Sequence, residues 1–271
     1  MNKRIGFIGC GNMGKAMVGS LINSNQKLAG QLLVSVRSQE SKVAISEKWP
    51  IHTTLDNKEV VLNSDIIFLA VNPIQYEEVI KEIREYVTDK KILISIAAGI
   101  KIKQMDEWIG AESKFILSMP NTPVLVNAGM TAICPNEHVT GEELEEICQL
   151  FSVFGEYEIL KEDDFEAFIA LCGSSPAYIF VLIEAMADAA VKLGIDRKKA
   201  YRMAEQTIMG SAQLALETGI HPAELKDQVC SPGGATIAAI TELEAHGFRN
   251  SVIKAMEVCA EQSKKMNDEV Y

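Results

Sequence analysis

The first residues that could do chemistry are three glycines near the start of the chain, in Gly9-Cys-Gly-Asn-Met-Gly14. They follow a short apolar run, Ile5–Ile8, and precede a helical pattern, which is the context in which this spacing binds a dinucleotide. Gly9 would permit a tight turn, Gly11 would let the backbone approach a pyrophosphate, and Gly14 would let the helix pack on the strand. The unpaired N–H groups of the helix would face the phosphates. We therefore predict a dinucleotide loop; a purely structural glycine turn is the alternative.

The same residues nearly match a second phosphate-binding motif. Gly9, Gly14 and Lys15 have the spacing of the loop in nucleoside triphosphatases, which requires a serine or threonine next to bind Mg²⁺. Ala16 stands at that position instead. The sequence therefore favours a dinucleotide over a nucleoside triphosphate.

The end of the second predicted strand, Leu32–Val36, bears on the choice of dinucleotide. Sites that select NAD usually carry an acidic residue about 20 residues beyond the glycines, bound to the ribose 2′-hydroxyl. Here Arg37 and Ser38 follow the strand, and the nearest acidic residue is Glu40. An arginine can hold a 2′-phosphate with two hydrogen bonds. We therefore expect NADPH as the preferred cofactor and NADH as a second option, unless Arg37 is an ordinary surface charge.

Later strand ends should line the same crevice, because ligands of doubly wound sheets bind outside the carboxyl ends of the strands. These segments are Ala70-Val-Asn-Pro73, Ala97-Ala-Gly99 and Met119-Pro-Asn-Thr-Pro123. Small residues in the last two would let a flat nicotinamide approach the backbone. The cofactor-binding residues predicted from the glycine loop and the strand ends are Ile8, Gly9, Cys10, Gly11, Asn12, Met13, Gly14, Arg37, Ser38, Ala70, Val71, Asn72, Pro73, Ala97, Ala98 and Asn121.

A second glycine-rich segment, Ser231-Pro-Gly-Gly-Ala-Thr236, leads into another predicted helix. Glycines at a helix start offer backbone N–H groups to an anion. Ser231 and Thr236 add hydroxyl groups. Spacing alone leaves two interpretations open, a site for a small carboxylate and a plain turn between helices.

Residues for other kinds of catalysis are scarce. The histidines are isolated and lack metal-ligand spacing, so no metal site is expected. There is no G-x-S-x-G sequence, which argues against an α/β-hydrolase. Cys172 has no evident base beside it, and a packed cysteine is the simpler interpretation. The six cysteines show no C-x-x-C pair, which favours free thiols in a reducing cytoplasm.

Composition points to a soluble acidic protein that acts on a small molecule. The chain has 271 residues and a formal net charge of −11. That charge argues against a nucleic-acid footprint or an anionic-membrane patch. No run approaches about 18 uninterrupted apolar residues, so no membrane span is expected.

The order of elements predicts two domains. Short apolar strands alternate with amphipathic helices up to Leu160, which is typical of a Rossmann-like, doubly wound α/β sheet. No convincing strand follows, and we expect a dinucleotide-binding domain at 1–161 and an all-helical domain at 162–271. Ala177–Ala190 is apolar on nearly all sides and should be buried. We expect burial against a second subunit; burial against the first domain is the alternative. The predicted strands are Ile5–Ile8, Leu32–Val36, Ile66–Val71, Ile92–Ile96, Phe115–Met119, Thr131–Cys134 and Tyr157–Leu160.

These motifs together resemble the pyrroline-5-carboxylate reductase family over essentially the whole chain. The most specific segment is Leu225–Glu244, around Ser-Pro-Gly-Gly-Ala-Thr, and the glycine loop and strand ends occur in the family's order. Two positions depart from the family pattern: Ser175 replaces a glycine, and Asn72 replaces a common lysine.

The resemblance implies a Rossmann domain, a helical dimerisation domain and sites formed between subunits. It implies reduction of 1-pyrroline-5-carboxylate to L-proline by NAD(P)H, through hydride transfer to the protonated cyclic imine. The family places Asn57 at the adenosine side of the cofactor and Glu162 near the nicotinamide. It assigns substrate binding to Ser231, Gly233, Gly234, Ala235 and Thr236. Because the hydroxyl of Thr236 could hydrogen-bond the ring nitrogen of the imine, we expect Thr236 to be the catalytic residue.

Two rival functions use the same architecture. A hydroxyacid dehydrogenase or another imine reductase is the near rival, but the nearest candidate for the dehydrogenase lysine, Lys192, lies at the end of a predicted helix. A nucleotide-binding regulator without catalytic activity is the distant rival, and it would not need the Ser231–Thr236 segment. Oxidation of NADPH with 1-pyrroline-5-carboxylate as the substrate, compared directly with NADH, is the observation that tests the main hypothesis against them.

Overall fold

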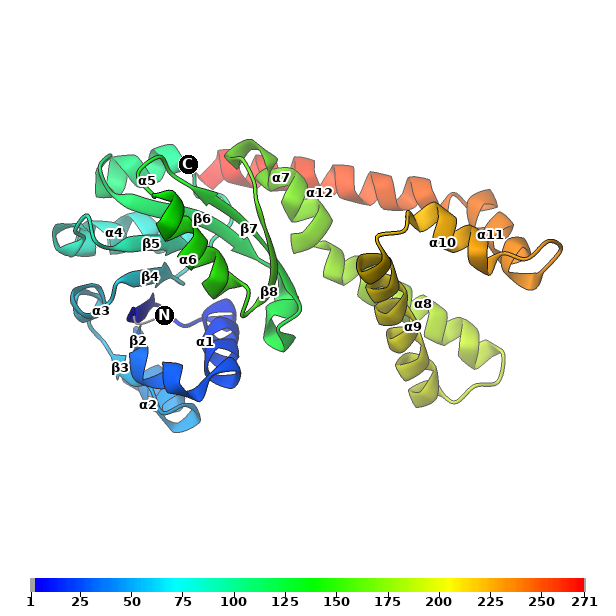
Figure 1. Ribbon diagram of the computed structural model, residues 1–271, viewed down its shortest axis with the longest axis horizontal. Coiled ribbons are helices and arrows are strands. Elements are labelled where there is room, and N and C mark those ends of the chain that lie inside the picture. The colour runs from blue at the N-terminus through cyan, green and yellow to red at the C-terminus, as the bar shows by residue number, and fades with distance from the viewer. Residues whose placement is uncertain (1–2, 271) are drawn as a thin grey trace. The chain divides into compact units, whose positions relative to one another are not determined.

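The computed structural model describes residues 3–270, with the side chains of 267–270 left aside, and divides into two compact units (Figure 1). Unit 1 runs up to Gly173 and resumes at Ala260, and unit 2 is Ser174–Cys259. The last helix, α12 (Phe248–Val270), therefore contributes residues to both units.

Unit 1 is built on an 8-stranded sheet of order β3-β2-β1-β4-β5-β6-β7-β8. The first six strands are parallel, β7 is antiparallel to β6, and β8 is parallel to β7. The chain fills one side of β1 and then crosses to the other, so the topological switch point lies between β1 and β4. The strands are β1 Ile5–Ile8, β2 Leu32–Ser35, β3 His52–Thr54, β4 Ile66–Leu69, β5 Ile92–Ser95, β6 Lys114–Pro120, β7 Gly129–Pro135 and β8 Gly155–Ile159.

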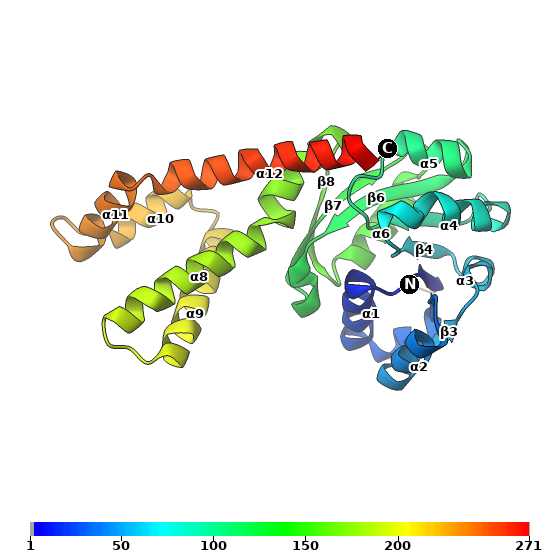
Figure 2. The same cartoon turned by 180° about the vertical axis from the view of Figure 1, so that it is seen from behind.

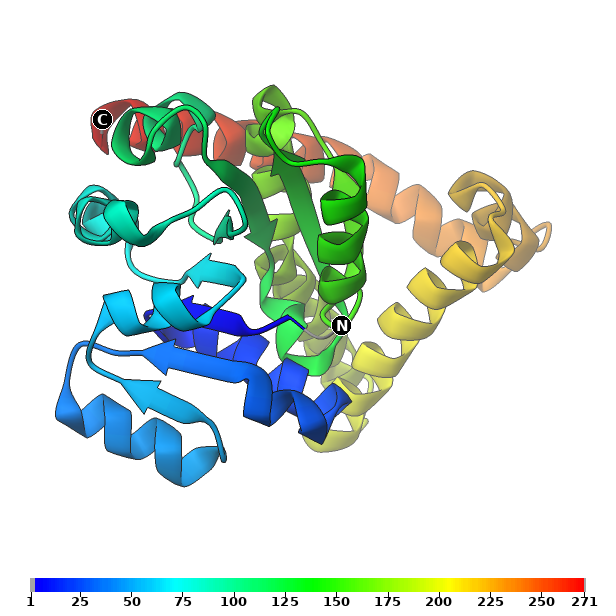
Figure 3. The same ribbon diagram turned by 60° about the vertical axis from the view of Figure 1, so that its left-hand side comes forward.

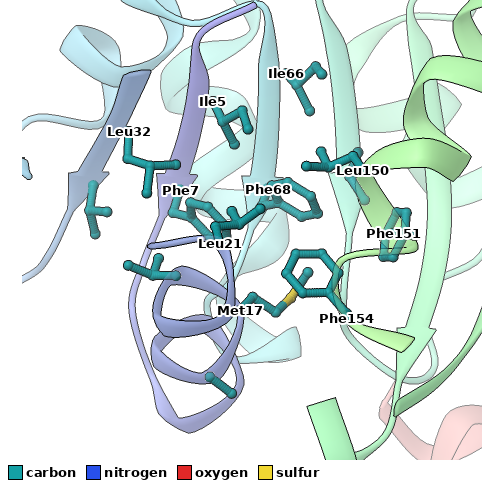
Figure 4. Packing of buried hydrophobic residues seen from close by; sticks show 14 of the residues in the cluster. Ile5, Phe7, Met17, Leu21, Leu32, Ile66, Phe68, Leu150, Phe151 and Phe154 are labelled. Carbon is teal, nitrogen blue, oxygen red and sulfur yellow. The ribbon is translucent and has the colours of Figure 1, made fainter. Parts of the chain in front are cut away.

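Helices cover both faces of this sheet, as the alternation of buried side chains requires. Phe7 and Phe68 face one layer, where their rings stack with centroids 4.7 Å apart (Figure 4). Ile8 and Leu69 face the other layer. The first layer contains α1 (Asn12–Ser24), α2 (Gln39–Lys48) and α6 (Gly141–Phe151); the second contains α3 (Asn57–Asn63), α4 (Tyr76–Ile83), α5 (Ile102–Ile109) and α7 (Phe165–Phe168).

Short helical turns join several of these elements. Five are 3₁₀ helices, and the sixth, Ile169–Gly173, is a π-helix directly before Ser174. The 3₁₀ turns are η1 Gln26–Gln31, η2 Pro73–Gln75, η3 Arg84–Tyr86, η4 Thr122–Val126 and η5 Glu162–Asp164.

The predicted fold class is confirmed, and all seven predicted strands are present: Ile5–Ile8 has the predicted bounds, and the other six differ by one or two residues at their ends. The sequence missed β3, which is three residues long and consists of His52, Thr53 and Thr54 (Figure 3, blue end of the chain). So short and polar a strand carries no periodic apolar signal. Thr140 is the N-cap of α6 and forms a capping box with Glu143, and the helix runs to Phe151.

Unit 2 contains helices and no strand among its described residues. The helices α8 and α9 pack together as a hairpin (Figure 2). Phe180 and Val181 on α8 are 61% and 64% exposed, so the predicted burial of this face is not provided within one chain. Besides α12, the unit contains α8 Ser175–Lys192, α9 Arg197–Thr218, α10 Pro222–Val229 and α11 Ala235–Ala245.

The segment Glu162–Lys192 is long and apolar enough to cross a membrane by length and composition. Charged and polar residues interrupt this segment, so it contains no apolar run of that length. A single helix of this kind is weak evidence for a span, because helices that pack against other protein pass the same test.

Candidate functional site

The glycine loop lies between β1 and α1, beside the end of β4. Gly9 has φ of +85°, and a Cβ atom there would lie 2.7 Å from Ala70 O. A Cβ on Gly14 would lie 3.2 Å from Ala70 Cβ. A Cβ on Gly11 would meet no atom within 4 Å. Gly9 therefore permits the turn and Gly14 permits close packing, whereas Gly11 faces open space where a pyrophosphate could approach.

The N-terminus of α1 is available to an anion. Gly11 is its N-cap, and no side chain caps the helix. The first N–H groups of a helix have no partner within the helix, and they carry a positive potential. The loop thus fits the phosphate-binding role that its sequence predicts.

A cleft of about 530 Å³ opens beside this loop at the carboxyl ends of β1, β2 and β4. The cleft is lined by residues of the glycine loop, of the end of β2 and of the turn after β4. The predicted cofactor residues that line it are Gly9, Cys10, Gly11, Arg37, Ser38, Asn57, Ala70, Val71 and Asn72.

At the end of β2, the cleft is lined by serine hydroxyl groups and by the guanidinium group of an arginine. Arg37 and Ser38 are exposed, and Ser41 lines the cleft beside them. Ser38 is the N-cap of α2 and accepts a hydrogen bond from Ser41 N at 3.2 Å. Arginine, hydroxyls and a helix N-terminus together suit a phosphate.

Asn57 is held from two sides at the start of α3. Its Oδ1 accepts a hydrogen bond of 2.7 Å from Ser35 Oγ, and its Nδ2 donates to Glu82 Oε2 at 2.8 Å. Ser35 and Glu82 also line the cleft. Neither residue was predicted from the sequence, although a serine ending the aliphatic strand β2 was a readable signal.

Ala97 and Glu162 lie together at a smaller cavity of about 10 Å³, which Gly99, Met119 and Lys101 also line. Glu162 Oε1 accepts a hydrogen bond of 2.9 Å from Ile102 N, at the start of α5. Glu162 therefore fixes the helix that follows Ala97–Gly99.

The remaining predicted cofactor residues line neither the cleft nor the smaller cavity. Asn121 is buried, and its amide donates to Cys172 O and accepts from Met130 N, each at 2.9 Å. Its side chain thus joins the π-helix to β7. Asn72, which lines the cleft and departs from the family pattern, uses its side chain within its own turn: its Oδ1 accepts a hydrogen bond of 3.2 Å from Ile74 N. The predicted residues outside the hollows are Ile8, Asn12, Met13, Gly14, Pro73, Ala98 and Asn121.

The second glycine-rich segment lies in unit 2, between α10 and α11. Gly233 has φ of +70°, and a Cβ on Gly234 would collide with Ser231 Oγ. Gly234 N donates to Ser231 O at 3.0 Å, and no side chain caps α11. Ser231 and Thr236 are exposed. The turn therefore needs both glycines, and it presents two hydroxyls beside uncapped N–H groups.

The cysteines near these sites are poor nucleophiles. Burial raises the pKa of Cys10 to about 11, although Lys15 and Lys48 act to lower it. Burial also raises the pKa of Cys172. A thiol reacts as its thiolate, so both side chains favour packing over catalysis. Among the described residues, no group of histidine, cysteine and acidic side chains could hold a metal ion.

Comparison with known proteins relates both parts of this chain to pyrroline-5-carboxylate reductases and NADP oxidoreductases. Residues 162–266 match the family profile described as pyrroline-5-carboxylate reductase dimerisation, and residues 4–99 match that of the coenzyme F420-dependent NADP oxidoreductases. The pyrroline-5-carboxylate reductase of Escherichia coli (strain K12) is 48% identical over 98% of this chain and 99% of its own. That of Methanosarcina acetivorans is 38% identical over 97% and 99%.

Solved structures agree with the sequence relatives. A pyrroline-5-carboxylate reductase from Coxiella burnetii superposes with a TM-score of 0.91 at 35% identity and covers 98% of both chains. The Plasmodium falciparum pyrroline carboxylate reductase with NADP bound gives a TM-score of 0.86 at 32% identity, with the same coverage.

Proposed function

Because the chain belongs to the pyrroline-5-carboxylate reductase family, we propose that its cleft in unit 1 binds NADPH in preference to NADH and that its Ser231–Thr236 turn binds the imine substrate. The enzyme reduces 1-pyrroline-5-carboxylate to L-proline in proline biosynthesis. The observation that carries the site assignment is the glycine loop, where Gly11 faces open space at an uncapped helix start.

The preference for NADPH is supported by the end of β2. Arg37, Ser38 and Ser41 supply a guanidinium and two hydroxyls there, and no carboxylate follows the strand directly to bind a ribose 2′-hydroxyl. A relative of known structure is described with NADP bound. Asn57 would bind the adenosine side, and the turns at Ala70–Pro73 and Ala97–Ala98 would receive the rest of the cofactor, with Glu162 holding α5 in place.

The substrate carries a carboxylate and a ring nitrogen, and the turn in unit 2 has groups for both. Ser231 Oγ and the N–H groups of Gly233, Gly234 and Ala235 would hold the carboxylate. Thr236 Oγ would hydrogen-bond the ring nitrogen and orient the imine. The nicotinamide cofactor supplies the hydride, and the protein supplies position and electrostatics.

The assembly we propose is a homodimer through residues 162–271, with larger assemblies built from it. The match to a dimerisation family begins at residue 162, which supports a functional boundary after Lys161. The exposed apolar side chains of α8 support the same role. We place the enzyme in the cytoplasm, where its six free thiols would stay reduced. The contact of Asn121 with the cofactor stays a prediction, since its amide already serves the scaffold.

The direct test is oxidation of NADPH by the purified protein with 1-pyrroline-5-carboxylate, run beside NADH. We expect turnover with both and a larger kcat/KM with NADPH. Absence of turnover with either cofactor would refute the function, and a larger kcat/KM with NADH would refute the cofactor preference alone.

A further inference from the structure

We propose that Ser35 and Glu82 are positioning residues that hold the carboxamide of Asn57 in one orientation for the adenosine end of the cofactor. This inference rests on the cofactor site proposed above and adds two residues to it. Ser35 ends β2, Asn57 begins α3 and Glu82 lies in the last turn of α4, so three separate elements meet at one amide group.

The carboxylate of Glu82 determines which way the amide points. An ionised carboxylate only accepts hydrogen bonds, so it must face the N–H₂ end of Asn57. The flipped amide would direct Oδ1 at Glu82 Oε2, which lies 2.8 Å from Nδ2. Two acceptors at that distance repel each other, so the flipped state is disfavoured.

The hydroxyl of Ser35 holds the other end of the amide. Ser35 is fully buried, and its Oγ lies 2.7 Å from Asn57 Oδ1 and 3.5 Å from Phe7 O. A hydroxyl has one hydrogen to donate, and the shorter contact to Asn57 takes it. The backbone oxygen of Ser35 accepts from Gly9 N at 3.0 Å, so the same residue ties the glycine turn to Asn57.

Glu82 has no ion pair within 4 Å among the described residues, so a surface salt bridge does not account for it. It lines the cleft from α4 together with Glu78, and Gln75 lines it from the preceding turn η2. With one bond made at each end, the Asn57 amide keeps one N–H and one lone pair for a ligand in the cleft. A preset orientation means that binding need not first select one of two amide states.

The test measures cofactor affinity by isothermal titration calorimetry, with NADPH and with adenosine 2′,5′-bisphosphate as a probe that lacks the nicotinamide. Glu82→Ala should weaken the binding of both ligands by roughly tenfold, the scale of one lost hydrogen bond. Glu82→Gln keeps an acceptor oxygen and should stay within about threefold of the wild type. In kinetics, Glu82→Ala should raise the KM for NADPH and leave kcat unchanged.

A double-mutant cycle separates positioning from a direct contact. If Glu82 and Ser35 act through Asn57, neither Glu82→Ala nor Ser35→Ala should weaken binding further in an Asn57→Ala background. The proposal would be overturned if Glu82→Ala weakened NADPH binding as much in the Asn57→Ala background as in the wild type. It would also be overturned if Glu82→Ala alone left the affinity for NADPH unchanged. Should Ser35→Ala fail to fold, the Glu82 variants carry the test.

Glu77→Ala is the matched control. Glu77 lies on the same helix and carries the same charge, but it pairs with Lys81 Nζ at 2.5 Å and lies outside the cleft. Its loss should leave cofactor affinity within about twofold. A wild-type protein that binds NADPH and shows the coupling, yet does not reduce the imine, would refute the proposed reaction and support the positioning role.

Discussion

At the scale of the residue, reduction of a protonated imine asks little acid–base chemistry of the protein. The carbon is already electrophilic, and a nicotinamide cofactor donates the hydride. What remains is to hold two ligands in register, which backbone N–H groups and a few hydroxyls can do. The uncapped starts of α1 and α11 and the hydroxyl of Thr236 fit that demand.

Thr236 gives the most direct residue-level test. Thr236→Ala should lower kcat/KM by about 10- to 100-fold, because it removes the polar contact that we propose Thr236 makes to the substrate in the transition state. Steady-state kinetics with 1-pyrroline-5-carboxylate measures this. Thr236→Ser keeps the hydroxyl and should retain most activity. Wild-type kinetics in the alanine variant would remove Thr236 from the mechanism.

Arg37 should govern the choice between the two nicotinamide cofactors. Arg37→Ala removes the guanidinium proposed to bind the 2′-phosphate, so the KM for NADPH should rise by roughly tenfold while that for NADH changes little. The ratio of kcat/KM for the two cofactors is the measurement. Arg84→Ala, outside the cleft, is the control. An equal effect on both cofactors would show that Arg37 does not read the 2′-phosphate.

Single residues of the site were predictable where a backbone requirement selects the residue type. Gly9 and Gly14 stand where a Cβ would crowd Ala70, and the spacing alone revealed them. A serine that ends the aliphatic strand β2 marked Ser35 as unusual, but the roles of Ser35 and Glu82 depend on contacts with Asn57 that only the tertiary fold creates. The cofactor contact predicted for Asn121 stays a prediction, and the bond that its amide donates to Cys172 O depends on a π-helix that no local sequence pattern indicated.

At the scale of the element, the carboxyl ends of the strands contribute more to the proposed cofactor site than the strand interiors do. The parallel strands β1, β2 and β4 end at one edge, and their following turns supply most of the cleft. Apolar runs located these strands well. The run of β7 did not reveal its reversed direction, because a strand buried on both faces has the same composition in either direction.

The capping box of α6 makes a pH-dependent contribution that can be measured. Partial burial would raise the pKa of Glu143, but hydrogen bonds from Lys114 and Thr140 outweigh it and lower the pKa. Lys114 Nζ lies 2.6 Å from Glu143 Oε1. The folded pKa is below the unfolded one, so the stabilisation is present above about pH 4.3 and is lost as pH falls through the folded value.

Glu143→Gln should therefore lower the melting temperature near about pH 7, and the difference from wild type should shrink as pH is lowered toward about 3.5. Thermal unfolding followed by circular dichroism at several pH values measures it. Glu142→Gln, in the same turn without the Lys114 bond, is the control. A difference that persists unchanged at the lowest pH would exclude the charge as its cause.

At the scale of the whole molecule, the exposed apolar surface of unit 2 needs a partner. Phe180 and Val181 leave more than half of their surface in contact with solvent in a single chain. Monomeric proteins rarely leave such helices uncovered, and the match of this region to a dimerisation family supplies the partner, a second copy. The sequence indicated this surface through a helix that is apolar on nearly all sides.

Phe180→Glu should split the assembly and abolish activity, because a buried charge without a partner is costly at an interface. Light scattering coupled to size-exclusion chromatography gives the mass of each variant. Leu62→Glu, on an exposed position of α3 in unit 1, should keep the wild-type mass. A Phe180→Glu protein of unchanged mass would place the interface elsewhere.

The division of α12 between the two units has a topological consequence. The chain leaves unit 1 after Gly173 and returns to it at Ala260, so unit 2 is an insertion with two covalent connections rather than a terminal appendage. One of the two connections is the continuous helix α12. Truncation of the chain after Gly173 would therefore remove residues of unit 1, from Ala260 onward, together with unit 2. The architecture thus favours one cooperative melting transition over independent unfolding of its parts, and a single proteolytic nick would not set either part free.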